Sequence, residues 1–168
     1  AGIGEQPPGH ELGVVLAQKH PVDADIVIAV PDSSNTSSLG FAQESGIRYE
    51  LGLIRNHYVG RTFIQPDQGL RERGIRMKFN PLAEIRGKRV VVVDDSIVRG
   101  TTTGPIVAML RRAGAAEVHV RIHSPEMRHP CYMGVDTGRR GELIASTHAT
   151  DEIRQVIGFD GKMNTAAG

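Results

Sequence analysis

The chain has 168 residues, a formal net charge of +1 and one cysteine. This length fits one domain with a single core, and the near-neutral charge argues against a general binder of nucleic acid or membranes. A single cysteine excludes an internal disulfide and fits a reducing compartment. With no apolar run of membrane length and no signal peptide, we expect a cytoplasmic protein that binds neither nucleic acid nor membrane.

The first part of the chain predicts a loop, a helix and a buried strand. Residues 1–9 are rich in Gly and Pro, and Glu11–His20 has the apolar spacing of a helix that Pro21 ends. The apolar run Ile26–Val30 then has the length of a buried strand.

A hydroxyl-rich turn follows this first strand. Pro31-Asp32-Ser33-Ser34 is expected to lead into a helix that runs to about Ser45 and ends at Gly46. Hydroxyl donors and a helix N-terminus would then meet at the end of a strand, where an anion can bind. Taken alone, the turn is better explained by an ordinary helix cap.

The next segment combines one expected strand, residues 47–54, with a basic stretch, residues 55–79. A solvated charged face is the simpler explanation of such a stretch. The glycines and aromatic residues among the charges favour a flap that closes over a diphosphate and excludes water. The cations are Arg55, Arg61, Arg71, Arg73, Arg76 and Lys78, and the anions are Asp67 and Glu72.

The most informative string is residues 90–104. Four valines predict a strand buried on both faces, and the apolar spacing from Ile106 predicts a helix that ends at Gly114. Between them lie Asp94 and Asp95, followed by a turn that contains hydroxyls and Gly100. In open α/β sheets, ligands bind at the carboxyl ends of the strands, and a helix N-terminus there favours phosphate.

The two adjacent carboxylates would repel a phosphate, so they need another partner. Sugar hydroxyls or a metal cation would serve, which together suggest a phosphorylated sugar with Mg²⁺ nearby. The string is neither a Walker A loop nor a GxGxxG fingerprint. Helix capping by Asp94 and Asp95 is the simpler alternative for the acidic pair alone.

The rest of the chain predicts smaller elements. Residues 118–122 alternate like a strand with one less buried face, and Ser124–Thr137 is expected to be a loop. Short helices are expected at 141–146 and 151–157, ending near Gly158. Residues 159–168 show no apolar pattern, so we expect a loose tail, with either no further edge strand in the sheet or a chain that is part of a longer one. The scattered histidines are expected at the surface or in ordinary packing.

The 90–104 string resembles the loop that binds phosphoribosyl diphosphate (PRPP) in type I phosphoribosyltransferases, in particular that of the amidophosphoribosyltransferases. Three further segments are similar to the same family: Val30–Ser33, Arg55–Pro66 and His129–Tyr132. The resemblance covers about residues 20–158. It implies an α/β fold with a mostly parallel central sheet flanked by helices, a flexible catalytic loop, and a phosphoribosyltransferase domain over 1–158.

The resemblance also implies an activity and the residues that carry it. The family transfers an amino group to C1 of the PRPP ribose and releases pyrophosphate, the first committed step of de novo purine biosynthesis. It implies a Mg²⁺ site at Ser33, Asp94 and Asp95. The catalytic set would be Arg55, Tyr58, Arg61, Asp94 and Asp95. The PRPP-binding set would be Asp32, Ser33, Ser34, Asp94, Asp95, Ser96, Val98, Arg99, Gly100, Thr101 and Thr102.

This sequence departs from the family pattern in two places within the catalytic loop. Arg55 stands where many relatives have Lys, which keeps the charge. His57 stands where many have Arg, which makes the charge at that position dependent on protonation.

Partners and cofactors follow from the same resemblance. In the complete enzyme a glutaminase domain with a terminal cysteine supplies ammonia from glutamine; this chain begins with Ala1, so we expect it to use at most free ammonia. Homo-oligomerisation is expected. Some members carry a [4Fe-4S] cluster with one ligand at the position of Cys131, but one cysteine cannot hold such a cluster.

Two other functions stay open at this point. Purine repressors resemble type I phosphoribosyltransferases, so a non-catalytic PRPP-binding regulatory module is one alternative. The other is a phosphoribosyltransferase that uses a purine or pyrimidine base as acceptor.

Overall fold

The computed structural model describes residues 8–58, 74–75, 77–130 and 139–165, with the side chains of 162–165 excepted; residues 1–7, 59–73, 76, 131–138 and 166–168 lie outside this description. Within these ranges no helix is long and apolar enough to cross a bilayer.

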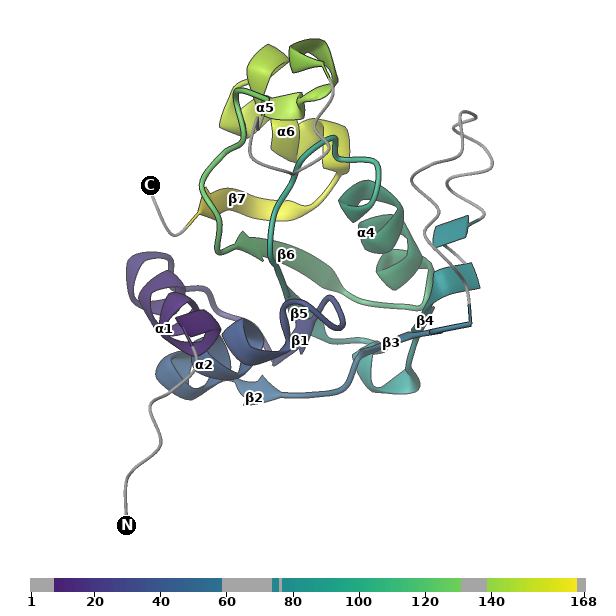
Figure 1. Ribbon diagram of the computed structural model, residues 1–168. Coiled ribbons are helices and arrows are strands. Elements are labelled where there is room, and N and C mark those ends of the chain that lie inside the picture. The colour runs from purple at the N-terminus through teal and green to yellow at the C-terminus, as the bar shows by residue number, and fades with distance from the viewer. Residues whose placement is uncertain (1–7, 59–73, 76, 131–138, 166–168) are drawn as a thin grey trace.

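A five-stranded parallel sheet forms the centre of the molecule (Figure 1), in the order β2-β1-β5-β6-β7. Every neighbouring pair in this sheet is parallel. Two further strands, β3 and β4, form a separate antiparallel pair. The large sheet consists of β1 (Ile26–Ala29), β2 (Arg48–Tyr49), β5 (Arg89–Asp94), β6 (Glu117–Ile122) and β7 (Asp160–Thr165), and the small one of β3 (Leu53–Arg55) and β4 (Phe79–Pro81).

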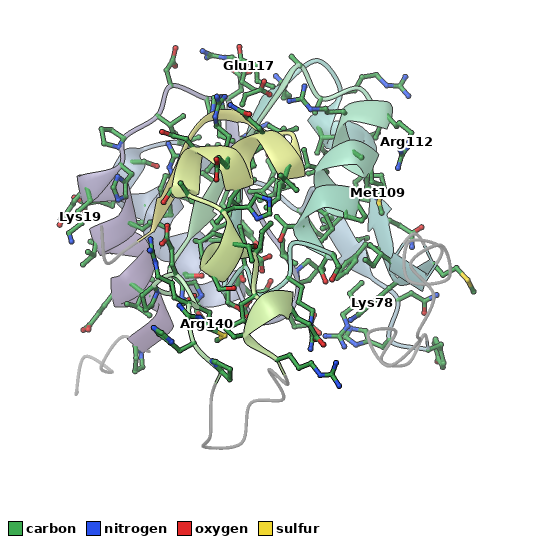
Figure 2. The ribbon with its side chains drawn as sticks, turned by 90° about the horizontal axis from the view of Figure 1, so that it is seen from above. Lys19, Lys78, Met109, Arg112, Glu117 and Arg140 are labelled. Atoms are coloured by element: carbon green, nitrogen blue, oxygen red, sulfur yellow. The ribbon has the colours of Figure 1, made fainter. Side chains whose placement is uncertain are left out.

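Helices cover both faces of the large sheet, which confirms the predicted α/β fold class (Figure 1). One face carries α1 (Pro8–Lys19) and α2 (Asn35–Ser45). The other carries α4 (Thr103–Arg112), α5 (Ile144–Thr147) and α6 (Thr150–Ile157). Figure 2 shows Lys19 of α1 and Arg112 of α4 on opposite sides of the molecule. The 3-10 helices are η1 (Ala83–Ile85) and η2 (Arg140–Glu142).

The valine run of β5 supplies both cores. Successive side chains of a strand point to opposite faces. Val90 and Val92 accordingly pack in the core under α4, whereas Val91 and Val93 pack in the core under α1 and α2. All four are fully buried, as predicted for a central strand of a parallel sheet.

Two glycines let α1 and α2 cross in close contact. A Cβ added to Gly13 would lie 1.9 Å from the carbonyl oxygen of Ser37, and one added to Gly40 would lie 2.1 Å from that of His10. These neighbours are backbone atoms, which cannot move as a flexible side chain can. The close crossing therefore depends on glycine at both positions.

The single strand predicted over 47–54 is wrong, because this stretch divides between two sheets. Arg48–Tyr49 pairs with β1 in the large sheet, and Leu53–Arg55 pairs with β4 in the small one. Gly52 lies between these two strands, and a Cβ added to it would lie 2.5 Å from Cγ2 of Ile28. A short-range pattern cannot show that the chain changes sheets there.

The prediction that β6 has a less buried face is also wrong. His119 and Arg121, the polar residues of its alternation, are 8% and 3% exposed. Each has a partner: His119 Nε2 lies 2.9 Å from a Glu117 carboxylate oxygen, and Arg121 Nε donates to the carbonyl of His20 at 3.2 Å. Polar side chains can be buried when hydrogen bonds replace their water.

The loose tail predicted over 159–168 is wrong for residues 159–165. Phe159 is 4% exposed, and the next six residues form β7, the edge strand that we expected to be missing. The Asp160 carboxylate accepts hydrogen bonds from the Val118 N–H and from Arg111, both at 2.8 Å. These partners are more than forty residues away in sequence, so the local pattern did not reveal them.

Candidate functional site

The carboxyl ends of β1 and β5 bring the two predicted ligand-binding turns together. The strands are adjacent and parallel, with Ala29 opposite Val93. The turn after β1 therefore lies beside the loop after β5. The hydroxyl of Ser34 donates a hydrogen bond to Oδ1 of Asp94 at 3.4 Å, which links the two turns directly.

Asp94 is a buried carboxyl group beside a second carboxyl group. It is 5% exposed, and its Oδ1 accepts a hydrogen bond from the Asp95 N–H at 2.9 Å. Burial, together with the charge of Asp95, raises the pKa of Asp94 to about 7. Asp95 itself is half-buried and accepts a hydrogen bond from the Ser96 hydroxyl at 3.2 Å.

This acidic pair fits the donor set that Mg²⁺ prefers. The pKa of Asp94 is raised because burial and the charge of Asp95 make its ionised form unfavourable. A bound cation would stabilise that ionised form. Mg²⁺ is held through one or two carboxylates, with water and substrate phosphate completing its octahedron. Within the described ranges, no group of three or more His, Cys, Asp or Glu could hold a metal by itself. Asp94 and Asp95 are the residues that would hold it; Ser33, the third predicted ligand, is exposed in the neighbouring turn.

The loop after Asp95 leads into the N-terminus of α4. Gly100 has φ +71°, a left-handed conformation that favours glycine, and its carbonyl accepts the Gly104 N–H at 3.2 Å. Thr101 is half-buried and Thr102 is exposed. The turn thus presents hydroxyl groups at a helix N-terminus, where the helix dipole favours an anion.

Val98 and Arg99 contact the region of η2 and α5 instead of the acidic pair. The carbonyl of Val98 accepts the Ile144 N–H at 3.0 Å, and Arg99 forms an ion pair with Glu142. The Arg99 guanidinium thus points Nε and Nη2 toward Glu142, and its predicted PRPP-binding role stays a prediction.

Two basic residues, one from β3 and one from the segment after it, lie beside the turn after β1. Asp32 and Ser33 are exposed, and the peptide bond between Pro31 and Asp32 is cis. Arg55 Nη1 lies 3.2 Å from Oδ2 of Asp32, and His57 Nδ1 lies 3.8 Å from the same oxygen. The Arg55 Nε is buried without a hydrogen-bond partner among the described residues.

The two ends of the predicted flap are held side by side by the small sheet. Arg55 of β3 is opposite Phe79 of β4, and the Asn56 N–H donates to the carbonyl of Lys78 at 2.7 Å. Tyr58, at the start of the flap, is fully exposed. Arg61 and residues 59–73, like Cys131, lie outside the described residues.

One residue of this edge, His123, is among the histidines expected at the surface or in ordinary packing. It directly follows β6, and its N–H donates to the carbonyl of Asp94 at 3.2 Å. Its Nε2 is buried without a partner among the described residues. Burial lowers the pKa of His123, while the charge of Asp95 opposes that shift. A position just after a strand next to β5 was the signal that could have identified it.

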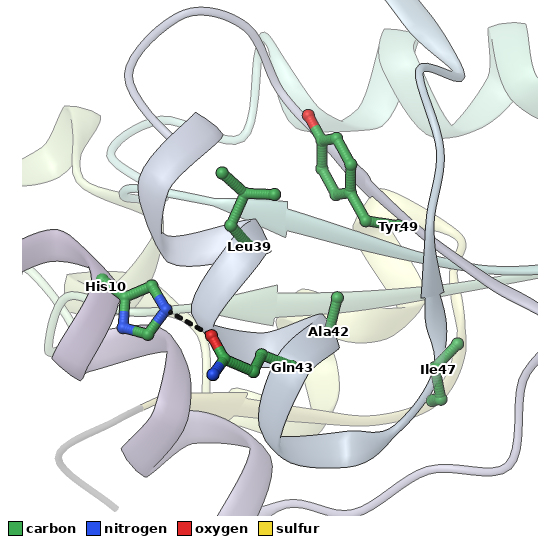
Figure 3. Close-up of a pocket in the computed structure, with 6 residues that line it drawn as sticks. All are labelled: His10, Leu39, Ala42, Gln43, Ile47 and Tyr49. Carbon is green, nitrogen blue, oxygen red and sulfur yellow. Dashed lines mark hydrogen bonds between the residues drawn. The ribbon is translucent and has the colours of Figure 1, made fainter.

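A separate pocket lies between α1, α2 and β2 (Figure 3). It has a volume of about 500 Å³, and within it His10 Nε2 lies 3.1 Å from Oε1 of Gln43. No residue predicted to bind ligand lines it, so we place the candidate site at the carboxyl edge of the sheet. Its lining residues are His10, Leu39, Ala42, Gln43, Ile47 and Tyr49.

No family model matches the chain. The chain is 58% identical over 160 residues to the amidophosphoribosyltransferase of Bacillus subtilis (strain 168), which covers 95% of this chain and 34% of that protein. It is 55% identical over 160 residues to the amidophosphoribosyltransferase of Archaeoglobus fulgidus, covering 95% of this chain and 35% of the relative. The chain thus spans about a third of the length of these curated relatives.

Solved structures give the same result. The glutamine PRPP amidotransferase from B. subtilis, complexed with ADP and GMP, superposes with a TM-score of 0.82 at 57% identity, covering 94% of this chain and 35% of that chain. A structure described as the allosteric regulatory enzyme of purine biosynthesis has a TM-score of 0.80 at 58% identity, covering 94% of this chain and 34% of that chain. Over nearly its whole length the chain is therefore similar to amidophosphoribosyltransferases, and it corresponds to about a third of their length.

Proposed function

We propose that this chain carries out phosphoribosyl transfer from PRPP to ammonia, giving 5-phosphoribosylamine and pyrophosphate. The observation that carries the proposal is the acidic pair Asp94–Asp95 at the carboxyl edge of the sheet, hydrogen-bonded to Ser34 of the neighbouring turn. Similarity to amidophosphoribosyltransferases over 95% of the chain supports the same reaction. On this proposal, residues 1–158 together with β7 form one phosphoribosyltransferase domain.

The reaction exchanges one bond at C1 of the ribose. The ammonia nitrogen forms a bond to C1, the bond from C1 to the pyrophosphate oxygen breaks, and its electron pair leaves with pyrophosphate. The new ammonium group then loses a proton to solvent. Negative charge grows on the leaving group and positive charge on the sugar ring, so opposite charges must be placed against each.

The residues of the edge divide these tasks. Asp94 and Asp95 hold the ribose hydroxyls and stabilise positive charge on the ring. The 96–102 turn and the N-terminus of α4 bind the 5′-phosphate, and this remote binding positions C1. Mg²⁺, when bound at Asp94 and Asp95 with Ser33, supplies positive charge against the pyrophosphate.

The turn after β1 and the start of the flap serve the leaving group. Asp32, Ser33 and Ser34 border the pyrophosphate position. Arg55 and Tyr58, together with Arg61, close over it, neutralise the departing charge and keep water away from C1. The pairing of Arg55 with Asp32 keeps this cation at the correct end of the site before ligand arrives.

The partners and the compartment are proposed on the same similarity. We propose that a glutaminase domain supplies ammonia in the complete enzyme, that the protein forms a homo-oligomer and that it acts in the cytoplasm. Cys131 is proposed as one ligand of a [4Fe-4S] cluster whose other ligands lie elsewhere in the complete enzyme.

Pyrophosphate release from PRPP, Mg²⁺ and ammonia tests the proposal. We expect release with ammonia and none with glutamine alone. Reactions with free purine or pyrimidine bases in place of ammonia form the control. Release only with a base would assign a nucleobase acceptor, and a folded, PRPP-binding chain that releases no pyrophosphate with any acceptor would contradict catalysis.

A further inference from the structure

Glu142 and Ile144 lie against three consecutive residues of the phosphate-binding loop, residues 98–100. Nε and Nη2 of Arg99 lie 2.9 and 2.7 Å from Oε2 of Glu142. The Ile144 N–H donates to the carbonyl of Val98 at 3.0 Å. A Cβ added to Gly100 would lie 2.9 Å from Cδ1 of Ile144, so these two residues are already in contact range. The loop is therefore held by contacts with Glu142 and Ile144 as well as by the hydrogen bond within its own turn.

The element that makes these contacts is itself fixed. Leu143 and Ile144 are 0% and 7% exposed. The Ser146 hydroxyl donates to the carbonyls of Arg140 and Leu143 at 2.6 and 2.8 Å. The Glu142 side chain, by contrast, is 46% exposed, so packing does not explain its position. Within the part of the chain that the structure describes, the ion pair of Glu142 is with Arg99 of the loop.

We infer that Glu142 is a positioning residue, which acts through Arg99 to hold the 98–100 backbone in the conformation that binds the 5′-phosphate of PRPP. This inference rests on the proposed function. A loop that is already fixed loses less conformational entropy when ligand binds. The 5′-phosphate does not change during the reaction, so the loop binds ground state and transition state alike, and Glu142 should affect PRPP binding more than turnover.

The inference predicts that loss of Glu142 changes KM for PRPP much more than kcat. Glu142→Ala should raise KM for PRPP about fivefold, the range expected for a partly exposed charge pair, with kcat within about twofold of the unsubstituted chain. Glu142→Gln keeps an oxygen that accepts from Arg99, so it should recover more than half of the lost affinity. Backbone amides of residues 98–100 should exchange faster with solvent deuterium in Glu142→Ala without any ligand.

A double-mutant cycle separates positioning from direct binding. In an Arg99→Met background, Glu142→Ala should cause no further rise in KM. If Arg99 were a direct PRPP ligand, Glu142→Ala would free its guanidinium and leave KM unchanged or lower, which would overturn the inference. An equal rise in the Arg99→Met background, or an equal fall in kcat, would overturn it too.

Glu50→Ala is the matched control. It removes a pair of similar length, Arg48 Nε to Glu50 Oε1 at 2.8 Å, at the β2 edge of the sheet, and should leave KM unchanged. Calorimetry with the unsubstituted chain distinguishes two failures. If that chain does not bind PRPP, the proposed function fails. If it binds PRPP and Glu142→Ala binds equally tightly, only the positioning role fails.

Discussion

At the scale of single residues, Asp94 lies in the candidate site, in surroundings that disfavour its ionised form. A carboxyl group that is 5% exposed and beside another carboxyl group is costly to ionise, which is why its pKa rises to about 7. Sites that perform chemistry often carry such groups. The sequence predicted that the two acids follow a buried strand, but it did not predict the hydrogen bond that Asp94 accepts from the Ser34 hydroxyl, sixty residues earlier.

The raised pKa predicts how stability depends on pH. The folded chain keeps a proton on Asp94 up to about pH 7, whereas the unfolded chain loses it near the ordinary value of 3.8. The unfolded state therefore binds fewer protons between these values, and the free energy of unfolding falls as pH rises through this window. Asp94→Asn should remove the fall and be more stable than the unsubstituted chain at pH 8, by at most about 4 kcal/mol.

Urea unfolding at pH 5 and pH 8, with a chelator present, measures this effect. Asp95→Asn should also reduce the fall, since it removes the neighbouring charge. If the free energy of unfolding falls by the same amount from pH 5 to pH 8 in the unsubstituted chain and in Asp94→Asn, the raised pKa of Asp94 is contradicted.

Gly100 offers a second test at this scale, because Gly87 is a matched control. Both have φ +71°, but a Cβ on Gly87 would meet nothing within 4 Å, whereas one on Gly100 would lie 2.9 Å from Cδ1 of Ile144. Gly87→Ala should lower the free energy of unfolding by about 1 kcal/mol, the cost of a left-handed conformation. Gly100→Ala should cost about 1 kcal/mol more, because Ile144 must move. Equal costs in urea unfolding would show that this contact is unimportant.

At the scale of elements, local patterns predicted most of the helices and strands but not their long-range partners. The Ile26–Val30 run, the helix ending at Gly46 and the valine strand correspond to β1, α2 and β5. The errors at 47–54 and 159–165 share a cause: where those segments go is decided by contacts distant in sequence, such as the bond from Val118 to Asp160. The contact of Glu142 with Arg99, forty-three residues apart, had no sequence signal either.

The close crossing of α1 and α2 requires a glycine, which has no side chain, at position 13. In Gly13→Ala the new Cβ would lie 1.9 Å from the Ser37 carbonyl oxygen, so the helices must separate and uncover their shared core. We expect the free energy of unfolding to fall by about 3 kcal/mol. Gly104→Ala is the control, because its nearest neighbour lies at 3.9 Å and alanine favours a helix by up to about 1 kcal/mol. Similar stabilities for these two variants, by thermal unfolding, would be inconsistent with the close crossing.

At the scale of the whole molecule, the parallel sheet explains why the candidate site could be predicted from sequence. Parallel strands end at the same edge, so the turns after two adjacent strands must meet, as those after β1 and β5 do. The sequence therefore predicted that the turns after these two strands share one edge; the ligand roles of their residues stay a prediction. It did not predict His123 or Glu142, because the neighbours of β6 and of η2 are set by the assembled fold.

The most direct test of the account is calorimetric titration of the chain with PRPP, in the presence and absence of Mg²⁺. We predict binding that Mg²⁺ strengthens, and a loss of affinity of at least about tenfold in the Asp94→Asn/Asp95→Asn double variant, whose shape is conserved while its charge is removed. An affinity for PRPP and Mg²⁺ that is the same in the double variant and in the unsubstituted chain would contradict the role of the acidic pair.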